Sequence, residues 1–315
     1  MTNSIVDERR KEIMIRLESA HNRMKRYESF RGPGVKRKIL RALLLRDKYL
    51  IYVLCQLHLL GQREVFAPTF LDKKIRVRVP DLDASYLFFY GILLGLEHKL
   101  CRYLVNELNE TDKFFDVGAN YGFYTLLAQS FSAEAHAFEP NPEICKLLEK
   151  TFNGENAVGV KINQIALADT IGEVNFYDTS AAGLSGRGTI ISETAENMSN
   201  FLKVQRVPTT TLDQYVEKFG RPTFIKIDVE GAELAVINGG IKTLTTTEGL
   251  TLAVEIWGGE RGRKFSTGVI ERLCDWGYKP FSLNELGQPI AVDIDSPIAY
   301  IDSLPNTFDN MIFKK

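Results

Sequence analysis

Short apolar segments alternate with segments of helical periodicity from residue 112 onward, and no other property of the chain limits its fold so strongly. Each apolar segment has the length of a buried strand, and an amphipathic stretch follows that can cross back over a sheet. The pattern predicts the α/β class, with a mostly parallel central sheet and helices on both faces. The expected strands are 113–117, 135–139, 160–165, 224–228 and 250–256, and the expected helices are 121–131, 142–152, 211–219 and 230–244.

The rest of the chain is expected to extend this core rather than to form a second large domain. The length of 315 residues suits one large domain with an extension, or two modest domains. We expect the first arrangement: an α/β domain at 71–315, with a motif-bearing core at 112–283, preceded by a basic helical extension at 1–70. Residues 87–108 look helical, and strands at 173–178 and 203–209 bracket a glycine- and serine-rich stretch, 180–188. A helix at 269–276, a strand at 278–283 and closing strands on the same sheet complete the prediction.

The densest signal is a glycine turn, residues 116–122, where an apolar strand ends in Asp116 and a helix follows at once. Gly118 permits positive φ, Gly122 allows a ligand or a helix to approach closely, and the helix start offers N–H groups to an anion. Asn120 stands where a dinucleotide fingerprint has its middle glycine. A ligand with a carboxylate for the N–H groups and an amine for Asp116 fits better, as in the amino-acid end of S-adenosylmethionine.

Glu139 ends the next apolar strand, 21 residues beyond Gly118. An acid at about 20 residues from such a turn commonly accepts hydrogen bonds from a ribose diol. Taken alone, Glu139 could equally be a surface acid near a helix start, where the helix dipole favours negative charge. The spacing from the glycine turn favours a nucleoside site.

The third signal is a set of ionisable residues in and just after the strand expected at 224–228. Asp228 and Glu230 are placed at its carboxyl end, where they can point into a ligand crevice. Glu233 is expected to cap the following helix instead. Lys226 alternates onto the same side of the strand as Asp228, so an ion pair between them is expected.

These segments together resemble the FkbM family of S-adenosylmethionine-dependent methyltransferases. The resemblance covers roughly residues 71–283 and is carried, in order, by DVGANYGFYT (116–125), FEPNP (138–142), NQIALAD (163–169), TLD (211–213), KIDVEGAE (226–233) and VEIW (254–257). It implies a Rossmann-like class I methyltransferase fold and methyl transfer to an oxygen, often a sugar or secondary-metabolite hydroxyl. It also implies that Asn141 and Ala166, within two of these motifs, belong to the donor site with Asp116, Gly118, Asn120, Gly122, Glu139 and Asp228.

Methyl transfer from a sulfonium needs alignment and the removal of one proton, and no covalent nucleophile. Asp228, Glu230 and Glu255 are the candidate catalytic residues, with Asp228 assigned mainly to the donor and the two glutamates to the acceptor side. A structural role for each acid is the competing interpretation. The stretch 180–188 is either a lid over the acceptor or a loose surface loop, and Trp257 either stacks on a sugar face or lies in the core.

No metal is expected. The four cysteines lie far apart, the four histidines have no mutual ligand spacing, and no cluster of carboxylates with an adjoining asparagine at strand ends is evident. His136, inside a strand, is expected to be a satisfied core residue. The cysteine pattern also lacks a disulfide framework, which fits a reducing compartment.

Charge is concentrated at the start of the chain. Residues 1–48 hold 14 lysines and arginines against 6 acidic residues, whereas the whole chain has a net charge of -1, which disfavours a general nucleic-acid binder. This region is either a solvated helical arm or a basic surface for anionic lipid, a polyanionic glycan or an acidic partner. Without a secretory signal or a long apolar run, the expected location is cytoplasmic, with peripheral contact at the inner membrane face as an option.

The main hypothesis is an O-methyltransferase that uses S-adenosylmethionine and acts on a hydroxyl of a glycan, glycolipid or related metabolite. One alternative is a nicotinamide-dependent oxidoreductase, which the missing middle glycine disfavours. Another is a non-catalytic, membrane-associated assembly factor on the same fold, in which the basic extension supplies the function.

Overall fold

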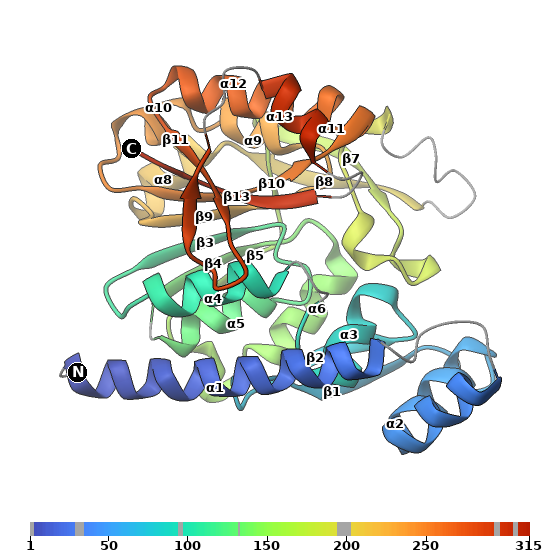
Figure 1. Cartoon of the computed structure of the whole chain (residues 1–315). Helices are drawn as coiled ribbons and strands as arrows, with labels where there is room; N and C mark the ends of the chain where they lie inside the picture. Colours follow the sequence, from blue (N-terminus) through green and yellow to red (C-terminus); the bar gives the residue numbers. More distant parts are fainter. Residues whose placement is uncertain are drawn as a thin grey trace.

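A computed structural model of the protein describes residues 3–28, 35–93, 97–131, 133–193, 203–292, 297–304 and 308–315. Eight of the described strands form a central sheet (Figure 1). They are β3 (Lys113–Val117), β4 (Glu134–Phe138), β5 (Val160–Asn163), β9 (Phe224–Ile227), β10 (Thr251–Trp257), β11 (Lys279–Leu283), β12 (Pro289–Ala291) and β13 (Phe308–Lys314). Their order across the sheet is β12-β11-β13-β10-β9-β3-β4-β5.

The sheet is parallel at its centre. Strands β5, β4, β3, β9 and β10 run in one direction, and β13 is inserted antiparallel between β10 and β11. The chain proceeds outward from β3 to β5 and then returns to the other side of β3 as β9. The order therefore reverses between β3 and β9, and ligands bind beyond the carboxyl ends of the strands at such a reversal.

Helices cover both faces of this sheet (Figure 1). One face carries α4 (Glu97–Glu107), α5 (Phe123–Ser130) and α6 (Pro142–Thr151), and the other carries α8 (Leu212–Phe219), α9 (Glu233–Asn238), α10 (Ile241–Thr246), α12 (Thr267–Asp275) and α13 (Pro297–Ser303). Side chains of neighbouring strand residues enter opposite cores: Phe114 belongs to the first and Phe115 to the second. The expected Rossmann-like α/β architecture is confirmed.

Several predicted boundaries were wrong for local reasons. The single helix expected at 230–244 is two helices, because Gly239 lies against the Ala168 carbonyl and the chain bends there. The helix expected at 87–108 is likewise two: α3 (Leu82–Tyr90) ends at Gly91, which is left-handed, and α4 begins at Glu97. Helix α11 (Gly259–Phe265) and α13 had not been predicted.

Two smaller sheets flank the core. Strands β6 (Ala166–Leu167), β7 (Gly172–Asp178) and β8 (Lys203–Thr210) form one, so the two strands expected around 180–188 pair with each other rather than with the central sheet. Strands β1 (Arg63–Pro68) and β2 (Lys74–Val79) form a hairpin beside α3.

The N-terminal helices differ in their packing. Helix α1 (Asn3–Glu28) lies against α4 and buries Ile13, Leu17, Ala20 and Met24 in the first core. The helix is therefore packed along one face and is not a fully solvated arm. Helix α2 (Val35–Gln56) lies at the edge of the molecule beside α3 (Figure 1). No helix in the described ranges has both the length and the apolarity to cross a membrane. The division at residue 70 stays a prediction.

Candidate functional site

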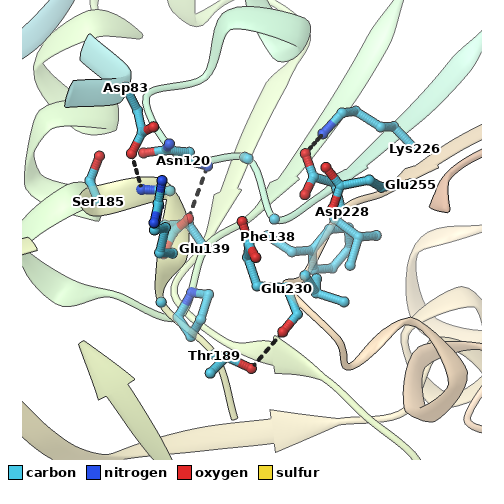
Figure 2. Close-up of a pocket in the computed structure, with 18 of the residues that line it drawn as sticks. Asp83, Asn120, Phe138, Glu139, Ser185, Thr189, Lys226, Asp228, Glu230 and Glu255 are labelled. Atoms are coloured by element: carbon cyan, nitrogen blue, oxygen red, sulfur yellow. Dashed lines mark hydrogen bonds and ion pairs between the residues drawn. The ribbon is translucent and has the colours of Figure 1, made fainter. Parts of the chain in front are cut away.

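A cavity of about 540 Å³ opens at the carboxyl ends of β3, β4, β9 and β10, at the reversal of strand order. We call it the switch-point cavity. Figure 2 shows Glu139 on one side and Asp228, Glu255 and Lys226 on the other, with Phe138 between them. The sequence argument thus placed Glu139, Asp228, Glu230 and Glu255 around the same cavity.

The glycine turn shapes the wall of this cavity. Gly118 has a φ of +83°, and a Cβ added there would lie 1.8 Å from the Asp228 carbonyl oxygen, so glycine is required where β3 and β9 end side by side. Gly122 serves helix packing, because a Cβ would meet Leu148 and Phe152 of the α6 region. The N–H groups of Gly118 and Ala119 both donate to the Phe138 carbonyl at 3.0 Å. They are therefore already bonded within the chain rather than offered to an anion.

Asp116 lies behind the turn. It is fully buried, and its Oδ2 accepts hydrogen bonds from the Thr125 N–H at 2.9 Å and the Thr125 hydroxyl at 2.6 Å. Burial raises the pKa of Asp116, and the nearby Lys226 ammonium opposes this. Asp116 is not among the residues that line the cavity, so in this structure it fixes α5 to β3. Its predicted contact with an amine stays a prediction.

Glu139 is held with its carboxylate at the cavity. Its Oε2 accepts from the Asn120 N–H and its Oε1 from the Asn141 N–H, both at 2.9 Å (Figure 2 shows the first). Burial raises the pKa of Glu139 to about 7, against the lowering effect of these two hydrogen bonds. A carboxylate has about four acceptor positions, so two remain for a ligand diol.

The residues beside Glu139 have separate roles. Asn141 caps α6 through the Glu143 N–H at 3.0 Å and donates to Asp178 at 2.8 Å, so it positions Glu139 but does not itself line the cavity. Ala166 does line it. Apolar side chains near Glu139 form an apolar part of the cavity wall, which we call the slot; they are Phe138, Ile165, Ala166, Leu167, Phe176 and Ile190. Phe176 and Ile190 had no recognisable sequence signal, since they come from the β7 sheet and the loop after it.

The opposite end of the cavity gathers acids. Oxygen atoms of Asp228, Glu230 and Glu255 lie within 4.8 Å of one another. Adjacent strands β9 and β10 bring Glu255 to the other two, which sequence reasoning did not foresee when it found no carboxylate cluster. Three such oxygens could also hold a cation. The expectation that the site works without a metal stays a prediction.

Each of these acids has a defined partner. Asp228 pairs with Lys226 at 2.9 Å, as expected, and Glu255 accepts from the Trp257 indole N–H at 2.8 Å. Glu230 pairs with Arg261 at 2.5 Å and has a φ of +55°, an uncommon conformation for a glutamate. Glu233 is buried and accepts from the Val229 and Gly231 N–H groups, so it holds the turn before α9; its expected role in capping that helix stays a prediction.

The electrostatics follow from crowding. Burial raises the pKa of Glu230 to about 7, assisted by the Asp228 charge, and burial with Asp228 and Glu230 raises the pKa of Glu255 well above its ordinary value. Burial alone would lower the pKa of Lys226, but Asp228, Asp116 and Glu97 more than offset it and raise that pKa. Near neutral pH, Glu230 and Glu255 are therefore protonated to a greater extent than ordinary glutamates.

The stretch 180–188 covers one side of the cavity, and its residues 185–188 line it. Ser185 bonds to Asp81 through its N–H at 3.2 Å and its hydroxyl at 3.1 Å, and the Gly186 N–H donates to Asp83 at 2.7 Å. Just beyond it, the Thr189 hydroxyl donates to the Glu230 carbonyl at 3.0 Å (Figure 2). The segment is thus tied to α3 and to the turn after β9, and is not a loose surface loop. Its movement as a lid stays a prediction.

Trp257 lies at the cavity wall, but its ring is not bare. The Arg261 guanidinium carbon is 3.5 Å from the ring centroid, and Phe308 packs at 5.7 Å between centroids. A sugar could stack on the Arg261 side only if that arginine moved. His136, by contrast, is a satisfied core residue as expected, with Tyr215 and Glu134 each at 2.8 Å from its ring nitrogens.

Comparison with known proteins decides the family. The model of the methyltransferase FkbM domain matches residues 116–280, just over half of the chain and nearly all of the motif core. The chain belongs to the FkbM methyltransferase family. The family's matched segment begins at the glycine turn and ends in β11, so it contains Glu139, Ala166 and the three clustered acids.

Two curated members are similar to this FkbM protein over part of their length. The hexuronic acid methyltransferase AglP of Haloferax volcanii is 32% identical over 146 residues, which are 45% of this chain and 56% of AglP. The 2-O-methyltransferase NoeI of Sinorhizobium fredii is 27% identical over 165 residues, 47% of this chain and 66% of NoeI. The matches therefore span less than two thirds of either relative.

Solved structures also match the FkbM protein's chain. A precorrin-6y C5,15-methyltransferase from Geobacter metallireducens aligns with a TM-score of 0.39 and 11% identity, over 70% of this chain and 88% of that one. TYW2 of Pyrococcus horikoshii in complex with MeSAdo aligns with a TM-score of 0.40 and 12% identity, over 77% and 67% of the two chains.

Proposed function

We propose that this FkbM protein is an S-adenosylmethionine-dependent O-methyltransferase that acts on a hydroxyl group of a glycan, glycolipid or related metabolite. The observation that carries the proposal is that the two ends of the switch-point cavity differ in their chemistry. One end has a buried carboxylate with two open acceptor positions next to an apolar slot, and the other end has three clustered acids.

The residues present fit the donor. The ribose hydroxyls of an adenosine would donate to Glu139, and its base would occupy the slot between Phe138 and Phe176. Within the described residues, six carboxyl groups and three cationic side chains line the cavity, and the carboxyl oxygens can accept hydrogen bonds from, or pair with, the cationic part of the donor. Asp228 is the acid that we assign to this cationic part.

The chain's own groups would then move one proton. The donor supplies an activated methyl group, so the protein must hold the acceptor oxygen in line and take its proton. Glu230, with a pKa raised to about 7, is suited to accept that proton near neutral pH, and Arg261 fixes its orientation. Glu255, protonated and bonded to Trp257, is suited to hold an acceptor hydroxyl by hydrogen bonds.

The acceptor class is supported by two kinds of observation. Both curated relatives carry names of methyltransferases, one for a hexuronic acid and one for a 2-O position. In this chain the acceptor end presents the carboxyl groups of Glu230 and Glu255, with Trp257 beside them beneath Arg261, and carboxyl groups are typical hydrogen-bond partners of a polyhydroxylated ring. A sugar hydroxyl is therefore the acceptor that we propose.

Isothermal titration calorimetry tests the donor. We expect S-adenosylhomocysteine to bind and NAD not to bind; the reverse result would favour an oxidoreductase and overturn the proposal. The reaction itself is tested by incubating the protein with isotope-labelled S-adenosylmethionine and an extract of its host, followed by mass spectrometry. A labelled sugar derivative is the expected product, and binding without any labelled product would leave only a non-catalytic role.

We further propose that the protein acts in the cytoplasm, with peripheral contact at an anionic membrane or an acidic partner through residues 1–48. The support is the local charge surplus of that region. Comparison of soluble and membrane fractions of host cells, with the full chain detected by antibody, tests the location.

A further inference from the structure

Part of helix α2 packs against α3, and leucines lie exposed elsewhere on its described residues and just after its end. Tyr52 contacts the Phe89 ring of α3 at 5.1 Å between centroids, and Cys55 is fully buried. Four leucines, which we call the leucine face, are 59–69% exposed: Leu43 and Leu50 of α2, on either side of a kink at Arg46, and Leu57 and Leu59 in the turn that follows α2. Leu50 and Leu57 are two helical turns apart, since Leu57 still donates its N–H to the Val53 carbonyl.

This apolar face belongs to a strongly basic helix. The 22 residues of α2 include six lysines and arginines and one aspartate. Exposed leucines on a water-facing helix cost solubility unless a partner covers them. A short helix that combines exposed leucines with many basic residues is typical of segments that lie in the interface of an anionic membrane.

A second cavity, of about 610 Å³, lies where α1, α2 and α3 meet, and we call it the basic cavity. Its lining includes three cationic residues, Arg23, Arg46 and Lys48, against one acid, Asp47. In the described part of the chain, neither Arg23 nor Arg46 has a carboxylate within ion-pair distance. Lys48 donates to the Phe88 carbonyl at 2.7 Å, which keeps its ammonium group at this wall.

The cations in this cavity repel one another. Burial, and then the Arg23 charge, lower the pKa of Lys48. A group of like charges with only one acid nearby gains stability when an anion enters, and a phosphate offers several acceptor oxygens to arginines. The cavity and the leucine face share helix α2, so one surface could provide both the phosphate and the apolar medium.

We infer that α2 docks this protein on an anionic phospholipid bilayer, with the lipid phosphate in the basic cavity and the leucine face among the acyl chains. This gives the peripheral contact proposed above a defined element and a defined ligand, and it does not depend on methyl transfer. Helix α3 connects the two sites, because Phe89 and Tyr90 line the basic cavity while Asp83 and Tyr86 line the switch-point cavity. Docking would therefore bring the switch-point cavity close to lipid-linked substrates.

Vesicle co-sedimentation of the full chain tests the inference. The vesicles are phosphatidylcholine alone, or equal molar parts of phosphatidylcholine and phosphatidylglycerol. We expect binding to the mixed vesicles that weakens as salt is raised, and little binding to neutral ones. Equal binding to both compositions, or no binding to either, would overturn the inference.

Two double variants separate the two parts of the surface. Arg23→Gln with Arg46→Gln should reduce the partition coefficient roughly 30-fold, since each cation near an anionic surface contributes about fivefold. Leu50→Glu with Leu57→Glu should reduce it by at least about tenfold, because apolar insertion is lost and negative charge is added. Unchanged partitioning in either variant would show that the assigned surface is not the docking site.

Matched controls use residues of similar exposure elsewhere. Ile15→Glu changes an apolar residue of α1 that is 70% exposed, and Arg206→Gln removes an exposed cation of β8. Both controls should sediment like the wild type. Each variant is also titrated with S-adenosylhomocysteine. A docking variant that binds S-adenosylhomocysteine normally but no longer binds vesicles supports the docking inference. A wild-type protein that binds vesicles but not S-adenosylhomocysteine would contradict the proposed function and leave the docking inference standing.

Discussion

Replacement of Glu139 by glutamine should weaken donor binding while leaving the protein folded. Two of the carboxylate's four acceptor positions are taken by the Asn120 and Asn141 N–H groups at 2.9 Å, and two remain for the ribose. A glutamine amide has a single acceptor oxygen, so at least one charge-assisted hydrogen bond to the ribose is lost. At about 1.5–3 kcal/mol for such a bond, the Kd should rise roughly 10- to 150-fold.

Calorimetry with S-adenosylhomocysteine measures this change. Glu143→Gln is the matched control, because Glu143 lies four residues further on, in the first turn of α6, and does not line the cavity. A ribose-deoxy analogue sharpens the test: the wild type should lose affinity for it, whereas Glu139→Gln should lose little more. The assignment of Glu139 to the ribose would be refuted if a folded Glu139→Gln protein bound S-adenosylhomocysteine with wild-type affinity. It would also be refuted if removal of the ribose hydroxyl weakened binding equally in the wild type and in Glu139→Gln.

Three further predictions concern the acids and the helical extension. Glu230→Gln should lower kcat by about 10²- to 10⁴-fold and leave donor affinity unchanged, because the proton acceptor is lost. The control Glu260→Gln, at the start of α11, should leave kcat unchanged. Unchanged turnover in Glu230→Gln would mean that Glu230 has a structural role only. Because the pKa of Glu139 is raised to about 7 and the ribose hydroxyls bind the ionised form, affinity for S-adenosylhomocysteine should increase between about pH 6 and pH 8. The free energy of unfolding of the ligand-free protein should decrease as the pH rises from about 4.5 to about 7, because Glu139 keeps its proton in the folded state and loses it in the unfolded chain. An affinity that falls with pH in calorimetry, or a stability that rises with pH in thermal unfolding, would contradict this. Leu17→Ala should reduce the free energy of unfolding by about 2–5 kcal/mol because Leu17 is fully buried, whereas Ile15→Ala on the exposed face of α1 should change it by less than about 0.5 kcal/mol; equal effects in chemical denaturation would mean that α1 does not belong to the core.

The sequence was most informative where one strand carries both the fold and the chemistry. The strand–turn–helix at 113–131 gave the positive φ of Gly118 and the close helix packing at Gly122, and the spacing to Glu139 put that carboxylate at the cavity. The alternation within β9 gave the Lys226–Asp228 pair. In each case the relevant partners are set by strand periodicity or by adjacent strands of a parallel sheet, which a sequence pattern records directly.

Sequence reasoning was weaker where two distant segments meet. Nothing in residues 224–256 shows that Glu255 lies within 4.8 Å of Asp228, because that proximity depends on β9 and β10 being neighbours. Asp116 and Asn141 belong to the expected motifs, yet both lie behind the cavity wall and support it. Asp83 accepts from the Gly186 N–H of the segment 180–188, a contact between residues more than 100 positions apart that the sequence pattern did not show.

A crystal structure of the protein with S-adenosylhomocysteine tests the central claim most directly. The ribose hydroxyls should lie within hydrogen-bond distance of Glu139, with the base between Phe138 and Phe176 and the sulfur facing Asp228 and the other clustered acids. A ligand bound elsewhere, or bound in this cavity with its ribose away from Glu139, would contradict the claim.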